Sequence, residues 1–292
     1  MREKIVPKQW IMWICIAAFA AFVIGTFFDL PINQVLYDPD STWSLFLYGF
    51  GAAPIYWCFL SSGILLTFKI RTGNIWKNAV LIAFGIGLTV FGLIFPAYYG
   101  YKHIAISLYL TAVSTFLMVV LPSAGILFLV WHTEQKKLRL MIAFMLILSI
   151  GSYATVSLIK VLFQRPRFIA LLREPGLFFQ PWWMITEKNL MISKNVLTEP
   201  DLFRSFPSGH TTSAAAIFAF ISLPLFSPAL AKQRNLLFAA AIGYVVLVAL
   251  SRLILGYHFL TDVTAGFMIT MLFFAFDYSW MIRKYKELEQ TS

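Results

Sequence analysis

Residues 236–262 read LLFAAAIGYVVLVALSRLILGYHFLTD, and this stretch decides the fold. The apolar run from 236 to 255 reaches the roughly 20 residues that a helix needs to cross a bilayer. It ends at Ser251-Arg252, Gly256 breaks the chain, and His258 and Asp262 stand at the start of the next apolar run. The pattern predicts two spanning helices that meet at one membrane face, with polar side chains at their junction.

The whole chain of 292 residues has this character, because 60% of it is hydrophobic and only 12% is charged. Soluble domains carry about 25% charged residues, so the composition predicts an integral membrane protein. Apolar runs of spanning length lie at about 10–28, 44–68, 77–97, 104–131, 140–163, 210–229, 236–255 and 262–282. We predict an all-α, polytopic membrane helical bundle of about eight transmembrane helices, with six or seven as the alternatives, in a single domain over 1–292.

Two of these apolar runs have features that a simple spanning helix lacks. The run from Trp10 to Phe28 follows a charged start, but no small-residue cleavage pattern comes after it. We therefore interpret it as a retained span or signal anchor rather than a signal peptide. The run at 104–131 contains Pro122, which predicts a kink.

Lysine and arginine residues gather at one side of the predicted bundle, as the positive-inside rule expects of cytoplasmic loops. With the N-terminus inside, the first outer loop, 29–41, has three Asp and no Lys or Arg, and the short outer loops hold only Lys102. The inner side holds Arg2, Lys4, Lys8, Lys69, Arg71, Lys77, Lys136, Lys137, Arg139, Lys232, Arg234, Arg283, Lys284 and Lys286. We predict a multi-pass protein of a plasma or inner membrane with cytoplasmic termini. Most of the net charge of +10 then needs no nucleic acid as a partner.

The remaining basic residues fall on the outer side, in or near three polar stretches. They are Lys160, Arg165, Arg167, Arg173, Lys188, Lys194, Arg204 and Arg252. This local excess of cations predicts an anion-binding site at the outer face. The loop 168–206 carries Trp182 and Trp183, a residue type favoured at the lipid–water boundary. We expect the loop to lie on the membrane surface, as an anchor and as a rim that admits a lipid head group.

The first polar stretch is KVLFQRPR, residues 160–167. Positions 160, 164 and 167 share one face of a helix, so Arg167 would project beside Lys160 if the helix continued. Arg165 would point about 140° away, although Pro166 disfavours helix at the residue before it. We favour Lys160 and Arg167 as phosphate contacts, with Arg165 as the substitute. The alternative for Lys160 is a side chain that merely reaches the interface.

The second stretch, Pro207-Ser208-Gly209-His210, opens an apolar run. Proline and serine favour a helix start, and a helix N-terminus offers free N–H groups that suit an anion. Gly209 lets the backbone come close to a ligand, and His210 could protonate a leaving oxygen. A capped helix with an interfacial histidine is the alternative.

In the third stretch, His258 and Asp262 are spaced i, i+4 and face the same way on a helix. The carboxylate can accept a hydrogen bond from one imidazole nitrogen, which leaves the other nitrogen free to attack. A structural ion pair between Arg252 and Asp262 is the alternative. The acidic residues are too scattered, and Cys/His arrays too sparse, to predict a metal site.

Together, Lys-x6-Arg, Pro-Ser-Gly-His and Ser-Arg-x5-His-x3-Asp resemble the three-part signature of the type 2 phosphatidic acid phosphatase (PAP2) family. That family includes bacterial lipid phosphatases, glucose-6-phosphatase and the vanadium haloperoxidases. The resemblance implies a PAP2/haloperoxidase-like helical core over about 140–282, with additional transmembrane helices in 1–139.

The family's roles carry over residue by residue. His258 resembles the nucleophile that forms a phosphohistidine, Asp262 its partner, and His210 the general acid. The residues that resemble the phosphate-binding groups are Lys160, Arg167, Arg252, Ser208 and Gly209. The resemblance implies no metal and no cofactor. The family usually has proline after the first stretch's arginine, whereas here Phe168 follows Arg167 and Pro166 precedes it, so Arg165-Pro166 remains an alternative pair.

The resemblance implies an enzyme that hydrolyses a lipid phosphomonoester or pyrophosphate at the outer face. Candidate substrates are phosphatidic acid, phosphatidylglycerol phosphate, undecaprenyl pyrophosphate and lipid A phosphates. The alternatives are phosphate transfer to another lipid, hydrolysis of a soluble sugar phosphate, and an anion transporter. Paired broken helices in two related halves would indicate a transporter, and the sequence has none. The sequence does not indicate an oligomeric state.

Overall fold

A computed structural model describes residues 6–104, 107–184 and 200–290, and within them it contains helices and no strand. The helices of the first half are α1 (Lys8–Leu36), α2 (Thr42–Phe50), α3 (Ala53–Phe68), α4 (Ile75–Ile104), α5 (Leu108–Thr115), the π-helical η2 (Phe116–Val120) and α6 (Leu121–Val130). Those of the second half are α7 (Gln135–Phe163), α8 (Phe168–Arg173), η3 (Pro200–Phe203), α10 (Gly209–Ala215), η4 (Ala216–Ser222), α11 (Leu223–Phe226), η5 (Pro228–Leu230), α12 (Arg234–Ile254) and α13 (Leu260–Gln290).

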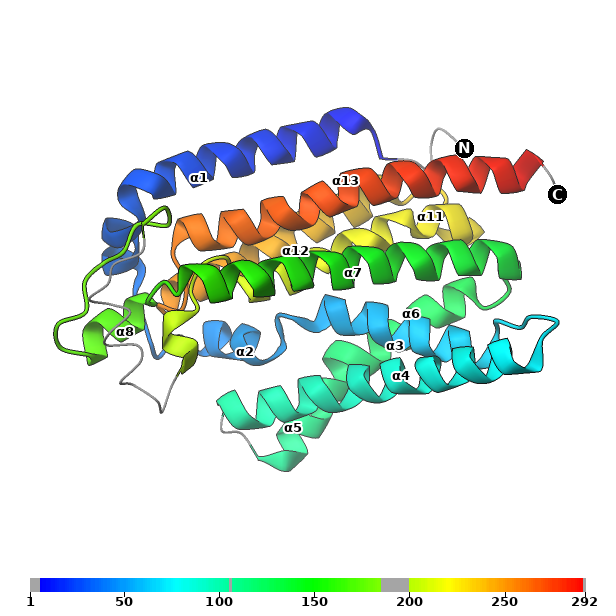
Figure 1. Cartoon of the computed structure of the whole chain (residues 1–292), viewed down its shortest axis with the longest axis horizontal. Coiled ribbons are helices and arrows are strands. Elements are labelled where there is room, and N and C mark those ends of the chain that lie inside the picture. Colours follow the sequence, from blue (N-terminus) through cyan, green and yellow to red (C-terminus); the bar gives the residue numbers. More distant parts are fainter. Residues whose placement is uncertain (1–5, 105–106, 185–199, 291–292) are drawn as a thin grey trace.

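Eight helical segments of the described chain are long and apolar enough to cross a membrane, so the predicted count of eight is confirmed. They are 8–36, 42–68, 75–102, 108–130, 135–173, 209–226, 234–254 and 260–290. The segments lie roughly along one direction, and the N- and C-termini lie at the same end of the bundle (Figure 1). Helix α8 and the junction between α12 and α13 lie at the opposite end, which we call the α8 end (Figure 1).

Helix α1 extends further than its apolar run predicts. It continues through Pro31 to Leu36, so the prediction that an outer loop begins at residue 29 is wrong. Membrane helices tolerate proline because neighbouring groups satisfy the freed backbone carbonyl. Asp29 and Asn33 in this extension are buried. Their side chains bond to the segment 253–261, which gives these last turns of helix a polar partner.

Two of the predicted spans contain a break. The second span is divided into α2 and α3 just before Pro54, whose ring and missing N–H interrupt a continuous helix. The fourth span passes from α5 through η2 into α6, and the π-helical turn lies directly before Pro122. Prolines and π-bulges are the usual causes of irregularity in helices, so the irregularity occurs at the proline that predicted it.

The segment from α10 to α11 lies inside the bundle, where α10 contacts α3, α7, α12 and α13. Ala214, Ala215 and Ala216 are fully buried in its first turns. Small side chains allow helix backbones to approach closely in a membrane, where packing replaces the hydrophobic effect between helices. The sequence Ala-Ala-Ala therefore places the start of α10, with the second polar stretch, among four other helices.

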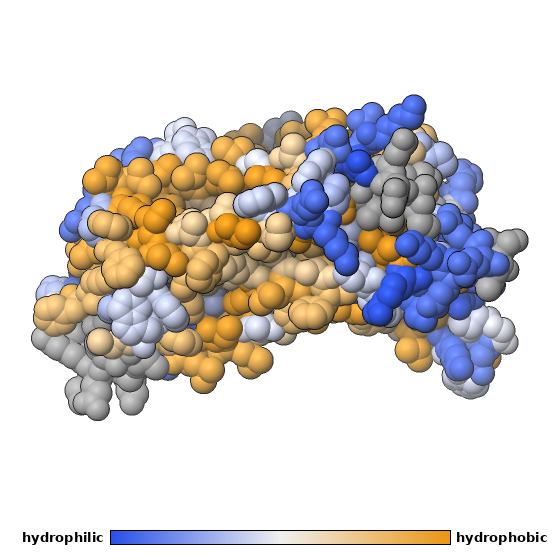
Figure 2. Space-filling model, turned by 90° about the horizontal axis from the view of Figure 1, so that it is seen from above, coloured by the Kyte–Doolittle hydropathy of each residue, from blue (hydrophilic) through white to orange (hydrophobic). Residues whose placement is uncertain are grey.

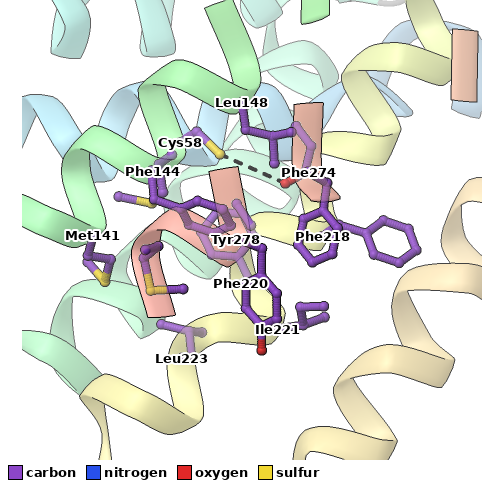
Figure 3. Packing of buried hydrophobic residues seen from close by; sticks show 14 of the residues in the cluster. Cys58, Met141, Phe144, Leu148, Phe218, Phe220, Ile221, Leu223, Phe274 and Tyr278 are labelled. Atoms are coloured by element: carbon purple, nitrogen blue, oxygen red, sulfur yellow. Dashed lines mark hydrogen bonds between the residues drawn. The ribbon is translucent and has the colours of Figure 1, made fainter. Parts of the chain in front are cut away.

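Aromatic side chains fill the next layer of the core (Figure 3). The Phe218 ring of η4 packs edge-to-face with the Phe274 ring of α13 at a centroid distance of 5.8 Å. The Phe274 ring stacks on the Tyr278 ring at 4.9 Å. The Cys58 thiol of α3 points at the Ala216 carbonyl, with 4.0 Å between sulfur and oxygen (Figure 3). These contacts tie the first and second halves of the chain into one core.

The outer surface has the composition of a lipid-facing one. Apolar residues cover most of the middle of the face seen in Figure 2, and hydrophilic residues gather towards the end that carries both termini. The inner basic residues of the sequence analysis fall at this end where the structure describes them, because they flank the helix ends there. Arg2, Lys4, Lys188 and Lys194 lie outside the described residues.

Ala215→Leu tests the packing around α10. Because Ala215 is fully buried, added methylene groups force neighbouring helices apart, which typically costs about 1–3 kcal/mol. We expect a lower unfolding temperature in detergent than for Ala239→Leu, the same change at an exposed alanine of α12. Equal unfolding temperatures for the two variants would contradict this packing.

Candidate active site

The three polar stretches meet at the α8 end of the bundle. Each lies where a helix starts or stops, so four helix ends together carry the predicted site residues. Lys160 is in the last turn of α7, Ser208, Gly209 and His210 start α10, Arg252 is in the last turn of α12, and His258 and Asp262 flank the start of α13. Their convergence places the basic side chains and both histidines on one side of the predicted membrane.

A turn at the end of α12 positions His258. Gly256 adopts a φ of 68°, which an L side chain rarely adopts. The N–H of Tyr257 donates to the Arg252 carbonyl at 3.0 Å, and the N–H of Gly256 donates to the Leu253 carbonyl at 3.0 Å. This pair of bonds is the Schellman motif that ends many helices. The turn reverses the chain and leaves His258 directly before α13.

Asp262 is buried and connected through both carboxylate oxygens. Its Oδ2 accepts hydrogen bonds from the Phe259 N–H at 2.7 Å and from the Ser205 hydroxyl at 2.5 Å. The first of these bonds is half of a capping box at the start of α13. Its Oδ1 accepts from Nη1 of Arg165 at 2.6 Å. The carboxylate is therefore held in one orientation by three separate segments of the chain.

The imidazole of His258 faces this carboxylate, with Nδ1 lying 3.6 Å from Oδ2 of Asp262. That distance is slightly beyond hydrogen-bond range, and catalytic hydrogen bonds are often long without a substrate. Burial lowers the pKa of His258 to about 3, and the charges of Lys160 and Arg167 act in the same direction, whereas Asp262 raises it. The imidazole is thus neutral near pH 7, the form that can act as a nucleophile.

The two arginines of the first stretch have different surroundings. The guanidinium of Arg165 is 1% exposed and lies between Asp29 and Asp262, with nitrogen–oxygen distances of 2.9 and 2.6 Å. Arg167 pairs with Asp201 at 3.6 Å, and that partner is 62% exposed. The structure therefore leaves Arg167 the freer of the two to meet an anion.

Arg167 does not share a helical face with Lys160, because α7 ends at Phe163 and the helix does not continue to residue 167. Gln164 adopts a left-handed conformation with a φ of 41°, and the chain leaves the helix there. The backbone N–H of Arg167 instead donates to the Leu202 carbonyl at 2.8 Å. Arg167 lies close enough to Lys160 for the two charges to act on one another, but a turn brings it there rather than a continued helix.

Two buried guanidinium nitrogens have no hydrogen-bond partner within the described part of the chain. They are Nε of Arg167 and Nη1 of Arg252. A buried polar group without a partner costs about 1–3 kcal/mol, and more when it is charged. Lys160 donates from Nζ to the Arg204 carbonyl at 2.5 Å and lies beside the start of α10, within 3.5 Å of the position of a Cβ at Gly209. The arrangement presents cationic donors that an anion would satisfy.

Arg252 forms no ion pair with Asp262 among the described residues, so the alternative of a structural Arg252–Asp262 pair is not realised. Its guanidinium lies 4.8 Å above the ring of Tyr48 and donates to the Ser251 hydroxyl. This cation–π contact holds the positive charge in place without neutralising it.

Aromatic side chains surround His210. Tyr48 of α2 stacks on the His210 ring at a centroid distance of 5.6 Å and on the Tyr257 ring at 4.5 Å. Tyr99 of α4 lies 5.5 Å from the His210 ring. Lys160, Arg167 and Arg252 all lie close enough to His210 to act on its charge. The histidine therefore stands at the edge of the same cationic site that faces His258.

Ser208 has a structural partner. Its hydroxyl oxygen accepts from the N–H of Thr211 at 3.3 Å and caps α10. Its own N–H donates to the Asp262 carbonyl at 2.9 Å, which fastens the second stretch to the third. The capped helix that the sequence offered as an alternative is present, and it holds His210 beside the cations.

The loop after the first stretch packs against α1 where the structure describes it. Trp182 donates from its indole N–H to the Thr26 hydroxyl at 3.2 Å and stacks on the Phe206 ring at 5.8 Å. The Gln180 carbonyl accepts from Nε of Arg165 at 2.7 Å. Residues 185–199 lie outside the described part of the chain, so the loop's role as a rim stays a prediction.

Sequence reasoning missed the site residues of the first four helices. Asp29, Tyr48 and Tyr99 lie far from the three polar stretches in sequence, and each sits in or beside an apolar run. The sequence contained one signal: Asp29 and Asn33 are spaced i, i+4, and two polar groups on one helical face of an apolar segment indicate a polar contact.

Among the described residues, His, Cys, Asp and Glu side chains do not gather in the groups of three that would suggest a metal site.

Comparison with known proteins identifies the family. Residues 138–286 match the family model described as the PAP2 superfamily. The chain belongs to the PAP2 superfamily. The resemblance read from the three polar stretches is thereby confirmed, and Asp29, Tyr48 and Tyr99 lie outside the PAP2 match.

One relative extends the comparison. Phosphatidylglycerophosphatase B of Bacillus subtilis (strain 168) is 42% identical over 72 residues, which are 24% of this chain and 36% of that protein. The match therefore spans about a third of the length of that Bacillus protein. No solved structure matches the chain.

Replacing the two arginines separately tests their different surroundings. Arg165→Gln leaves two buried carboxylates without their cation, and breaking a buried pair costs about 3–5 kcal/mol. We expect a large fall in unfolding temperature in detergent. Arg167→Gln should leave that temperature nearly unchanged and weaken the binding of inorganic phosphate, measured by calorimetry. A stable Arg165→Gln protein that loses phosphate binding would reverse the assignment.

Proposed function

We propose that this PAP2 protein is a membrane phosphatase that hydrolyses a phosphomonoester or pyrophosphate carried by a lipid, through a phosphohistidine at His258. One observation carries the proposal: the unpartnered donors of Arg167 and Arg252 are buried beside Lys160 and both histidines. A phosphate group would satisfy these donors. Phosphoryl transfer depends mainly on positioning and on stabilising charge at the phosphoryl oxygens, and this arrangement of cations suits that need.

In the proposed first step, Nε2 of His258 attacks the phosphorus, because Nδ1 faces Asp262. The new N–P bond forms as the bond from phosphorus to the leaving oxygen breaks, and His210 gives that oxygen a proton. The carboxylate of Asp262 stabilises the positive charge that develops on the imidazole. In the second step His210 takes a proton from water, whose oxygen attacks the phosphorus as the N–P bond breaks and its electron pair returns to Nε2 of His258. Inorganic phosphate leaves, and His258 is neutral again.

The cations would act on the three other phosphoryl oxygens. Lys160, Arg167 and Arg252 supply fixed donors in a site from which much water is excluded, where such interactions are strongest. The Ser208 hydroxyl and the Gly209 N–H, at the start of α10, are the further contacts that the family resemblance implies. Arg165 has a different part in the proposal, because its guanidinium already holds two carboxylates.

A lipid substrate is supported by the position of the site at one end of the eight apolar helices that the described part of the chain forms. There a phosphate can enter the polar site while its tails stay in the bilayer. The name of the Bacillus relative favours phosphatidylglycerol phosphate as the first substrate to test. Phosphatidic acid and undecaprenyl pyrophosphate share the same reacting group. The proposed location is a plasma or inner membrane, with cytoplasmic termini and the site at the outer face.

Replacing the nucleophile tests the reaction directly. His258→Ala should lower phosphate release from these lipids by about 10³-fold or more, as removal of a nucleophile does elsewhere. His132→Ala is the matched control, because His132 is exposed at the opposite end of the bundle. Both proteins should keep the wild-type unfolding temperature. Full activity in a folded His258→Ala protein would reject the mechanism.

His210 can be tested with two leaving groups. A general acid contributes about 10²–10⁴-fold when the leaving oxygen is basic. His210→Asn should therefore slow release of a lipid alcohol far more than release of p-nitrophenol, which departs as the anion. Equal losses on both substrates would show that His210 does not protonate the leaving group.

Assays of the purified protein distinguish lipid phosphate hydrolysis from the alternative functions. Release of phosphate from sugar phosphates but not from lipids would favour a soluble substrate, and label appearing on an acceptor lipid would favour phosphate transfer. Parallel assays with and without a chelator test the metal-independent mechanism that the family resemblance implies.

A further inference from the structure

Two polar side chains of α1 are buried against the third polar stretch, although α1 lies outside the PAP2 match. Asp29 is 2% exposed and Asn33 is fully buried. They stand one helical turn apart, so they point to the same side of α1. The proposed mechanism gives neither of them a part, and an ionised carboxylate at this depth is unfavourable unless it is paired.

Asp29 accepts three hydrogen bonds from two segments of the site. Its Oδ1 accepts from the Thr261 N–H at 2.9 Å, and its Oδ2 accepts from the Thr261 hydroxyl. Its Oδ2 also accepts from Nη2 of Arg165 at 2.9 Å. The Nη1 of Arg165 donates to the Thr261 hydroxyl at 2.8 Å and to Asp262 at 2.6 Å. Asp29 thus reaches the carboxylate of Asp262 through a single guanidinium.

Asn33 holds the other side of the same turn. Its Nδ2 donates to the Leu253 carbonyl at 3.2 Å and to the His258 carbonyl at 3.0 Å. One amide group therefore connects the last turn of α12 to the residue proposed as nucleophile. Together Asp29 and Asn33 fix the backbone on both sides of the His258 side chain.

Gly25 allows α1 to come this close. A Cβ at Gly25 would lie 2.9 Å from the Thr261 nitrogen and 2.9 Å from the Asp29 carboxylate. No side chain fits there without moving one of the two helices. Gly25, Asp29 and Asn33 are spaced at four residues, so the contact surface of α1 is one continuous face turned towards 253–261.

We propose that α1 is part of the active site and that Asp29 is a positioning residue for the His258–Asp262 pair, an inference that rests on the proposed function. Asp29 takes one half of the Arg165 guanidinium, so the other half meets Oδ1 of Asp262, and Oδ2, which also accepts from Phe259 and Ser205, faces Nδ1 of His258. It also fixes Thr261, the residue directly before Asp262. Without Asp29 the Arg165 guanidinium would pair with Asp262 alone. The segment that carries His258 and Asp262 would also lose one of its contacts with α1.

This role predicts a loss of rate rather than of substrate binding. The cations proposed to bind phosphate do not bond to Asp29 in the described structure, so KM should change little. A misplaced nucleophile slows the step in which its bond to phosphorus forms, and small misplacements can cost about 10²-fold. We expect Asp29→Asn to lower kcat by about 10²-fold with KM within about twofold of the wild type.

The kinetic experiment compares Asp29→Asn with Asp40→Ala, a change at an exposed acidic residue of the α1–α2 loop. Asp40→Ala should keep the wild-type kcat. On an Asp262→Asn background, the further effect of Asp29→Asn should shrink to less than about threefold, because residues that act through one another are not additive. Full additivity, or a loss confined to KM, would overturn the proposal. If Asp29→Asn does not fold, Asn33→Leu tests the other half of the α1 contact, and an unchanged kcat in that variant would overturn the inclusion of α1 in the active site.

A second measurement does not depend on activity. In protein labelled with nitrogen-15 at histidine, the His258 signals can be assigned by their absence from His258→Ala. Asp29→Asn should shift these signals and leave those of His132, at the other end of the bundle, unchanged. Unshifted His258 signals would overturn the positioning role. If the His258 signals shift in Asp29→Asn but the wild-type protein hydrolyses no lipid phosphate, the positioning contact from α1 is retained and the proposed function is rejected.

Discussion

The guanidinium of Arg165, buried between the carboxylates of Asp29 and Asp262, is the interaction on which the rest of the site depends. A single ionised group at this depth is strongly unfavourable, and three of them are tolerated because each meets an opposite charge and further hydrogen bonds. The pairing connects α1, the end of α7 and the start of α13. His258 owes its place beside Asp262 to that connection.

The basic residues at this end of the bundle divide into two kinds. Arg165 is neutralised by carboxylates, whereas the buried Arg252 keeps its charge by lying over Tyr48 and has one nitrogen without a partner among the described residues. Arg167 has a distant, exposed acidic partner. The first kind fixes the shape of the site, and the second is the kind that we propose binds the anion. Arginine suits both uses because its planar fork can hold two acceptors at once.

Much of this arrangement was predictable from the sequence. The length of the apolar runs predicted eight spans, since a bilayer sets the length of a helix that crosses it. The glycine at 256 predicted the break that turns the chain after α12. The i, i+4 spacing of His258 and Asp262 predicted that they face one another, although His258 stands two residues before α13 and not on its helical face. The positions of the three stretches at helix ends predicted that they would meet.

Other features depend on tertiary contacts that no local pattern encodes. The apolar run of α1 ends at Phe28, so Asp29 was placed in a loop, whereas it lies inside α1 and pairs with Arg165. Likewise, helical periodicity distinguished Arg165 from Arg167 on the assumption that α7 continued, but the chain leaves the helix at Gln164. Tyr48 and Tyr99 come from α2 and α4, where no local pattern distinguishes them from the neighbouring aromatic residues. Their role emerges when α2 and α4 pack beside α10.

The proposed mechanism requires the imidazole of His258 to become covalently bound to phosphorus. Rapid mixing of the enzyme with a lipid phosphate labelled at phosphorus, followed by quenching in alkali, tests it most directly, because phosphohistidine survives alkali. We expect one labelled peptide, containing residue 258, with the label lost when excess unlabelled substrate is added before the quench. Label on a different residue, or turnover with no labelled protein at any time, would contradict it.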